Sequence, residues 1–106
     1  MTKRDPKHYK ALYFDMRIQA LKEWYPKKNH LGAYKNMKRY LLKHGFRHEQ
    51  WSGYHSTQKM TDLEIFELVE DMASELQWFS KCVNHFAATN VESNYNLIEI
   101  LEDVEI

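Results

Sequence analysis

The sequence is poor in cysteine, glycine and proline, and it contains no long apolar run. Its 106 residues include one cysteine, three glycines and two prolines. The single cysteine, Cys82, excludes an intramolecular disulfide and is typical of a reducing compartment. The three glycines are widely separated, at positions 32, 45 and 53, which excludes a glycine loop that cradles phosphate. No run of about 18 apolar residues is present, so we predict no transmembrane helix.

The start of the chain is polar and basic and lacks the apolar segment of a secretory signal. We therefore expect a cytoplasmic protein. Hydrophobic residues make up 43% of the chain and aromatic residues 14%, which is enough for one core. A chain of this length favours one domain. We predict a basic lead-in over residues 1–7 and a single domain over residues 8–106.

The formal net charge of zero hides a division between the two halves of the chain. Before Ser56 the sequence has 13 Lys and Arg against four Asp and Glu, whereas from Ser56 onward it has two against 11. This asymmetry indicates either a basic surface for phosphates or two neighbouring elements of opposite charge that pack side by side. Both interpretations remain open at this point.

The pattern of apolar residues predicts a strand followed by a helix in the first half. Residues 8–16 form a short aromatic-rich run of strand length. Residues 17–30 are ambiguous, because their helical spacing is interrupted by Pro26. From Leu31 to Leu42 apolar residues recur at steps of three and four, which predicts a helix. Asn29 is a candidate cap for its start, and Gly45 has the position of a terminating glycine.

In the second half, residues 46–55 predict a two-stranded hairpin that turns near Gly53. Thr61 and Glu64 form a capping box, which predicts the start of the clearest helix in the chain. This helix continues or restarts through residues 78–83, and residues 86–91 predict a final strand. Residues 95–104 suggest one more short element. The order is that of an α+β, ferredoxin-like βαββαβ domain with an antiparallel sheet and two helices on one face.

Asp15 is the residue with the most chemical interest, because it ends a strand that is otherwise apolar. A carboxylate there is costly unless it is solvated, hydrogen-bonded or bound to metal. It is a candidate general base or ligand for a hard cation, or it simply caps the next turn. Cys82 is expected to be buried and inert, and the six histidines lack the partners of a zinc site.

Three segments resemble the virulence-associated protein D (VapD) family. They are residues 11–16 (ALYFDM), 45–54 (GFRHEQWSGY) and 78–83 (WFSKCV). Members of that family open with a strand that ends in Phe-Asp, close a helix with Gly-Phe and continue with a Gln-x-Ser-x-Tyr hairpin. The resemblance spans residues 9–101. The family is similar in fold to the small CRISPR-associated nuclease of the spacer-adaptation complex.

The resemblance implies a ferredoxin-like homodimer with endoribonuclease activity, often as the toxin of a toxin–antitoxin pair. At the matching positions it implies a catalytic aspartate and a set of hairpin residues, namely Asp15, Gln50, Ser52 and Tyr54. This chain differs from the usual pattern of the family at Trp51, Gly53, Asn84, His85 and Ala87.

The nuclease hypothesis suggests two chemical routes. Two Asp15 carboxylates that meet across a two-fold axis would hold a divalent cation such as Mg²⁺ or polarise the attacking oxygen. A metal-independent route uses the 2′-hydroxyl of RNA, with Asp15 or His48 as base. The candidate phosphate contacts are Lys10, Arg17, Lys35, Lys38 and Arg39. The candidates for stacking on bases, worth about 1–3 kcal/mol each, are Tyr13, Trp51 and Tyr54.

A second hypothesis is a non-catalytic dimeric module that binds a partner protein or nucleic acid. In that case the opposite charges of the two halves serve docking. The nuclease hypothesis requires Asp15 to lie at an accessible position, whereas the module does not.

Overall fold

The computed structural model describes residues 6–50 and 53–91, which form an α+β fold. In chain order the elements are β1 (Tyr9–Met16), α1 (Ile18–Trp24), α2 (Gly32–Lys43), β2 (Phe46–Gln50), β3 (Gly53–Ser56), α3 (Asp62–Glu75), α4 (Phe79–Cys82) and β4 (Val83–Val91). No helix in the described part of the chain is long and apolar enough to cross a membrane.

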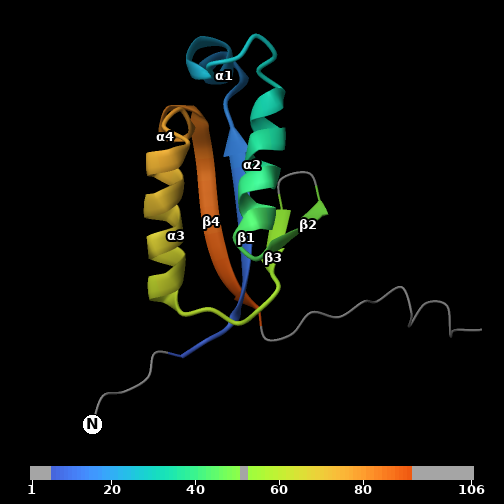
Figure 1. Cartoon of the computed structure of the whole chain (residues 1–106), viewed down its shortest axis with the longest axis vertical. Coiled ribbons are helices and arrows are strands. Elements are labelled where there is room, and N and C mark those ends of the chain that lie inside the picture. The colour runs from blue at the N-terminus through green and yellow to red at the C-terminus, as the bar shows by residue number, and fades with distance from the viewer. Residues whose placement is uncertain (1–5, 51–52, 92–106) are drawn as a thin grey trace, which may run out of the picture.

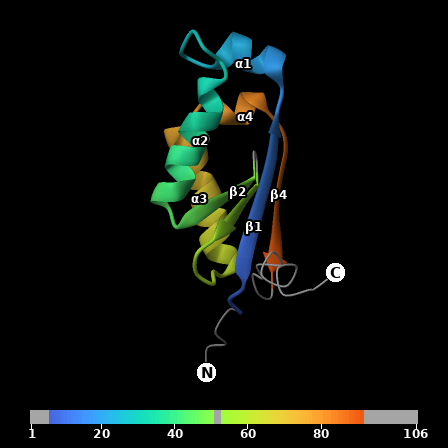
Figure 2. The same cartoon turned by 90° about the vertical axis from the view of Figure 1, so that its right-hand side faces the viewer.

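The four strands form one antiparallel sheet in the order β2-β3-β1-β4. Helices α2 and α3 both lie against one face of this sheet, whereas its opposite face carries no helix of the described chain (Figures 1 and 2). This arrangement is compatible with a ferredoxin-like fold, so the predicted fold class is confirmed. Two short additional helices, α1 and α4, lie together at the end of the sheet where β1 ends and β4 begins (Figure 1).

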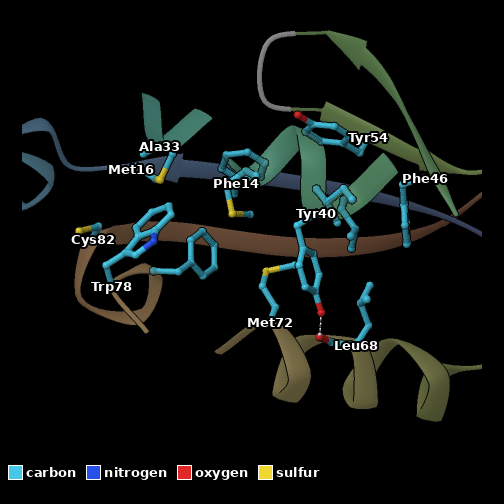
Figure 3. Packing of buried hydrophobic residues seen from close by; sticks show 14 of the residues in the cluster. Phe14, Met16, Ala33, Tyr40, Phe46, Tyr54, Leu68, Met72, Trp78 and Cys82 are labelled. Atoms are coloured by element: carbon cyan, nitrogen blue, oxygen red, sulfur yellow. Dashed lines mark hydrogen bonds between the residues drawn. The ribbon is translucent and has the colours of Figure 1, made fainter. Parts of the chain in front are cut away.

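The core lies between the sheet and the helices because alternate residues of β1 point toward α2 and α3. Leu12, Phe14 and Met16 are buried on this face. The Phe14 ring is at the centre of an aromatic cluster, with ring centroids 5.9 Å from Tyr54 and 6.2 Å from Phe79. Figure 3 shows these side chains filling the space between β1, β3 and the helices. Burial of these rings is the main source of stability for the sheet–helix packing.

The two long helices begin and end largely where the sequence predicts. The Thr61 hydroxyl accepts a hydrogen bond from the Glu64 backbone N–H at 3.1 Å, and the Glu64 carboxylate accepts one from the Thr61 N–H at 3.1 Å, which forms the predicted capping box. Gly45 has a φ of 87°, a conformation that favours glycine, just after α2. Asn29 does not cap α2 directly, but its side chain accepts a hydrogen bond from the Leu31 N–H.

The structure resolves one ambiguous segment of the prediction, and it places the start of one strand differently. The ambiguous segment forms α1, which ends at Trp24 because Tyr25, the residue before Pro26, is extended. The last strand begins at Val83 rather than Phe86, since β1 continues to Met16 and pairs with the earlier residues of β4. The short element predicted over residues 95–104 lies outside the described residues.

Candidate functional site

Asp15 lies near the end of β1, with its side chain exposed. In the pairing of β1 with β4 it is opposite His85, and the register shifts immediately afterwards, between Asp15 and Met16. The Asn84 amide donates a long hydrogen bond of 3.5 Å to the Asp15 carboxylate. The carboxylate is therefore exposed to solvent at a strand end and is not enclosed in an ordinary turn.

His85 points to the same side of the sheet as Asp15. Directly opposed residues of an antiparallel pair share one face, with Cβ atoms about 4.5–5.5 Å apart. Both side chains are exposed, on the face that α2 and α3 do not cover. Tyr13, two residues earlier on the same face, has 36% of its surface exposed. A carboxylate, an imidazole and an aromatic ring thus lie next to one another on an accessible surface.

The charge of Asp15 affects the pKa of Tyr34, which lies on α2. Burial raises the pKa of the Tyr34 hydroxyl, and the negative charge of Asp15 raises it further. The Tyr34 ring lies 6.4 Å from Phe14, the residue before Asp15, measured between ring centroids. The Tyr34 ring therefore borders the site from the helical side.

Two cationic side chains lie at the same end of the sheet. The Arg17 guanidinium donates a hydrogen bond to the Lys81 backbone carbonyl at 3.0 Å, and the Arg17 backbone N–H donates to the Cys82 carbonyl at 2.8 Å. The Lys81 ammonium lies 3.9 Å from the centroid of the exposed Trp24 ring. Arg17 follows Asp15 by two residues and is bound to the carbonyl of Lys81, so both cationic residues lie at the end of β1 that carries Asp15.

Cys82 is buried next to Lys81 in the chain, and its environment disfavours the thiolate. Burial raises the pKa of its thiol, and this effect outweighs the opposite influence of Arg17 and Lys81. The prediction of a buried thiol is confirmed.

The hairpin of β2 and β3 reaches the same end of the sheet as Asp15. Gly53, at the start of β3, is opposite Tyr13 on β1. Gln50 is the last residue of β2. Trp51 and Ser52, which the resemblance assigns to the site, lie outside the described residues.

Tyr54 is a core residue, and its position does not fit the catalytic role that the resemblance implies. It is opposite Leu12 and faces the helices, whereas Asp15 faces the other side of the sheet. Its ring stacks on Phe14 and lies 4.7 Å from the His48 ring, centroid to centroid. Only 1% of its surface is exposed, and burial raises the pKa of its hydroxyl to about 12. His48, stacked on Tyr54, is likewise on the side of the sheet opposite to Asp15.

Lys10 is not available for phosphate, contrary to the prediction. Only 2% of it is exposed, because strand alternation places it on the face that α3 covers. Its ammonium lies 2.5 Å from the Asp62 carboxylate and 2.5 Å from the Asn90 side-chain oxygen. The hydrogen bond from Lys10 holds the pKa of Asp62 below its usual range. Lys10 therefore joins β1, β4 and the start of α3.

The other predicted phosphate contacts are exposed, but they do not form one cluster. Arg17 lies beside Asp15, whereas Lys35, Lys38 and Arg39 lie on α2, on the helical side of the sheet. An extended RNA strand would have to pass over the end of the sheet to contact both groups.

The donor set for a metal ion is small. No group of three or more His, Cys, Asp and Glu side chains within residues 6–50 and 53–91 is arranged to hold a metal. Mg²⁺ commonly takes one or two protein carboxylates together with substrate phosphates. Asp15 of one chain would supply a single carboxylate to such an ion, and the remaining ligands would come from substrate phosphates or water.

Comparison with known proteins gives one informative similarity. No protein-family model matches the chain. Endoribonuclease VapD 2 of Riemerella anatipestifer is similar. The two sequences are 23% identical over 88 residues, which cover 83% of this chain and 94% of that protein. The similarity therefore extends over nearly the full length of the relative and is consistent with a VapD-like family.

Three residues of the site were not predicted from the sequence, namely Tyr34, Lys81 and His85. Sequence spacing gives no sign that His85 is opposite Asp15, because the register of β1 with β4 follows from the extra residues at the start of β4. The apolar spacing of α2 assigned Tyr34 to the core. Only the tertiary arrangement brings these side chains together.

The electrostatic effect of Asp15 on Tyr34 can be tested without any assay of activity. Replacing Asp15 with Asn removes a negative charge that disfavours the tyrosinate, so the pKa of Tyr34 is expected to fall. It stays above the ordinary value of about 10, since burial is the larger cause. NMR titration of ¹³Cζ-labelled tyrosine measures the shift. The matched control is Asp71→Asn, which removes the negative charge beside the Tyr40 hydroxyl and is expected to lower the pKa of Tyr40 instead. An unchanged Tyr34 titration in the Asp15 variant would contradict the arrangement.

Proposed function

We propose that this chain is an endoribonuclease whose chemistry is centred on Asp15. The observation that carries the proposal is the exposed Asp15 carboxylate next to Asn84, opposite His85 and near two cations. The similarity to a protein named Endoribonuclease VapD 2 supports cleavage of RNA as the reaction. We further propose that the protein acts as the toxin of a toxin–antitoxin pair, as the sequence resemblance implies.

In the proposed reaction the 2′-hydroxyl of the substrate is the nucleophile. Asp15 accepts the hydroxyl proton as the 2′-oxygen attacks phosphorus. The bond from phosphorus to the 5′-oxygen then breaks, and His85 donates a proton to that leaving oxygen. The products are a 2′,3′-cyclic phosphate and a 5′-hydroxyl end. Opposed positions on two strands suit such a pair, since the base and the acid act on opposite sides of the phosphorus atom.

In this proposal, Arg17 and Lys81 stabilise the negative charge of the transition state. The phosphorus gains negative charge on its non-bridging oxygens in the transition state, and cations that are already held in place stabilise that charge with little reorganisation. Arg17 is held by its hydrogen bond to the Lys81 carbonyl, and Lys81 by the Trp24 ring. Tyr13, on the same face, offers a ring on which an unpaired base can stack. Single-stranded RNA is thus the proposed substrate class.

Dimer formation and metal dependence are parts of the same proposal. A two-fold axis near the uncovered face of the sheet would bring a second Asp15 toward the first. Two carboxylates together with a phosphate would then match the ligands that Mg²⁺ prefers. The acid–base route described above needs no ion. Cleavage that persists in EDTA and leaves cyclic phosphate ends favours that route.

Asp15→Asn is expected to lower the rate of RNA cleavage about 10²–10⁴-fold, because the amide cannot accept the proton. The rate is measured with a labelled oligoribonucleotide on protein whose far-UV circular dichroism matches the wild type. The control Glu67→Gln removes an exposed carboxylate of α3, remote from the site, and should leave the rate unchanged. Equal cleavage by the Asp15 variant would reject the proposal and would point to a contaminating nuclease. RNA binding without cleavage by the wild type would favour the non-catalytic module.

His85→Asn is expected to lower the cleavage rate about 10²-fold, because the leaving oxygen loses its acid. His55→Asn is the matched control: His55 is on the same face but is opposite Ala11, farther from Asp15. A loss of equal size with a substrate whose leaving group needs no proton, such as a 5′-thiolate, would indicate that His85 has a structural role only.

Substitution of Arg17 is expected to affect RNA binding, whereas substitution of Lys10 is not. Arg17→Ala should weaken binding and reduce the slope of log affinity against log salt by about 0.7, the value for one phosphate contact to a single strand. Lys10→Met should leave the slope unchanged, because the Lys10 ammonium is buried against Asp62. Both slopes are measured by fluorescence anisotropy of labelled RNA, with each substitution made in the inactive Asp15→Asn variant. A reduced slope for Lys10→Met would show that this ammonium reaches RNA after all.

A further inference from the structure

A hollow of about 440 Å³ lies between α3 and β4, separate from Asp15. Its floor is formed by Leu12 of β1 and by Phe86 and Ala88 of β4. Its wall is formed by Ile65, Phe66 and Val69 of α3. The surface is almost entirely apolar, and it opens beside β4, which ends the sheet in the described part of the chain.

The hollow continues along the start of α3. Phe66 also lines two neighbouring hollows of about 300 Å³ and 310 Å³, one with Asn90 and the other with Leu63. Phe66 is 62% exposed and Leu63 is 55% exposed. Large apolar side chains that gather at a concave surface indicate a docking site, whereas single exposed ones do not. The three hollows are called the α3 groove below.

The helix that forms the wall of the α3 groove is strongly acidic. Helix α3 carries six carboxylates and no Lys or Arg: Asp62, Glu64, Glu67, Glu70, Asp71 and Glu75. Glu70 lines the largest of the three hollows, and Asp62 borders the other two. Lys10 also lines one of them, but its ammonium is already paired with Asp62. Complementary charge guides association and selects partners. An occupant therefore needs apolar side chains for the floor and basic side chains for the rim.

The other segments of this chain do not meet both requirements. Residues 92–106 contain five Asp and Glu and no Lys or Arg, so α3 would repel them. Helix α2 of a second copy is basic, but its apolar residues, which include Ala33, Met37 and Leu41, are buried in its own core. Residues 1–5 are basic and precede Pro6, which lines one of the hollows, but Met1 is their only large apolar side chain. A separate protein therefore meets both requirements better than these segments do.

We propose that the α3 groove binds a basic amphipathic helix of a partner protein. Apolar side chains three and four residues apart would enter the groove beside Phe66, and Lys or Arg on the flanks would face Glu67 and Glu70. The proposal does not depend on cleavage of RNA, because none of these residues takes part in the proposed reaction.

The test uses a labelled synthetic peptide of about 14 residues, with Leu at helical spacing and Lys elsewhere. Fluorescence anisotropy measures its binding to the full chain. Phe66→Ser is expected to weaken binding at least about tenfold, as the loss of a central apolar contact does. The double variant Glu67→Lys, Glu70→Lys should weaken it by about the same factor. Leu42→Ser, which changes a residue of α2 that is 48% exposed, is the control and should leave binding unchanged.

Three results would overturn the proposal. One is equal binding of the peptide to wild type and to Phe66→Ser. Another is equal binding of a peptide in which Glu replaces every Lys. A wild-type dimer that Phe66→Ser converts to a monomer would assign the groove to a second copy. RNA cleavage by the same variants, measured in parallel, keeps this test separate from that of the proposed function.

Discussion

The central position of β1 is the constraint on which the rest of the structure depends. This strand pairs with β3 on one side and with β4 on the other, so both of its edges are used and its two faces must have different roles. One face buries Leu12, Phe14 and Met16 against the helices. A shift of the strand by one residue would exchange the faces and place Asp15 in the core, where an unpaired carboxylate is costly. The same packing that stabilises the sheet therefore also holds the carboxylate at the surface, where it can meet a substrate.

Local patterns in the sequence were enough to predict the fold but not the composition of the site. The capping box at Thr61, the glycine at position 45 and the alternation along β1 are each determined by neighbouring residues, and the structure has all three. Alternation already placed Lys10 on the side of Leu12, yet a lysine there was taken for a phosphate contact because its partner Asp62 is 52 residues away. The resemblance brought Asp15 and Tyr54 into one site, whereas the register of β1 with β3 separates them onto two faces. Pairing between residues far apart in the sequence determines which side chains share a face, and short stretches of sequence do not reveal it.

The basic first half of the chain and the acidic second half each supply one of the two long helices on the sheet. The basic helix α2 and the acidic helix α3 cover the same face of the sheet, so two elements of opposite charge lie side by side. Tyr40 makes a direct polar contact between them, because its hydroxyl donates a hydrogen bond to the Asp71 carboxylate at 2.5 Å. The same hydroxyl lies 3.4 Å from the Leu68 carbonyl oxygen (Figure 3). Most of the charges on both helices are therefore exposed to solvent. An exposed charge contributes little to stability but strongly affects which partners approach.

Strand β4 connects the two proposed surfaces. Its successive residues alternate, so His85 faces the side of Asp15 while Phe86, the next residue, lines the α3 groove. A helix bound in the groove would press on Phe86, whose ring also packs 5.4 Å from Phe79 of α4, centroid to centroid. Helix α4 in turn carries Lys81, whose carbonyl accepts the hydrogen bond from Arg17. The groove therefore borders the strand that carries His85 and is linked through Phe86 and Phe79 to the helix that carries Lys81. If both proposals hold, a partner that binds two arrangements of β4 with different affinity would change the rate of the proposed RNA cleavage without covering Asp15.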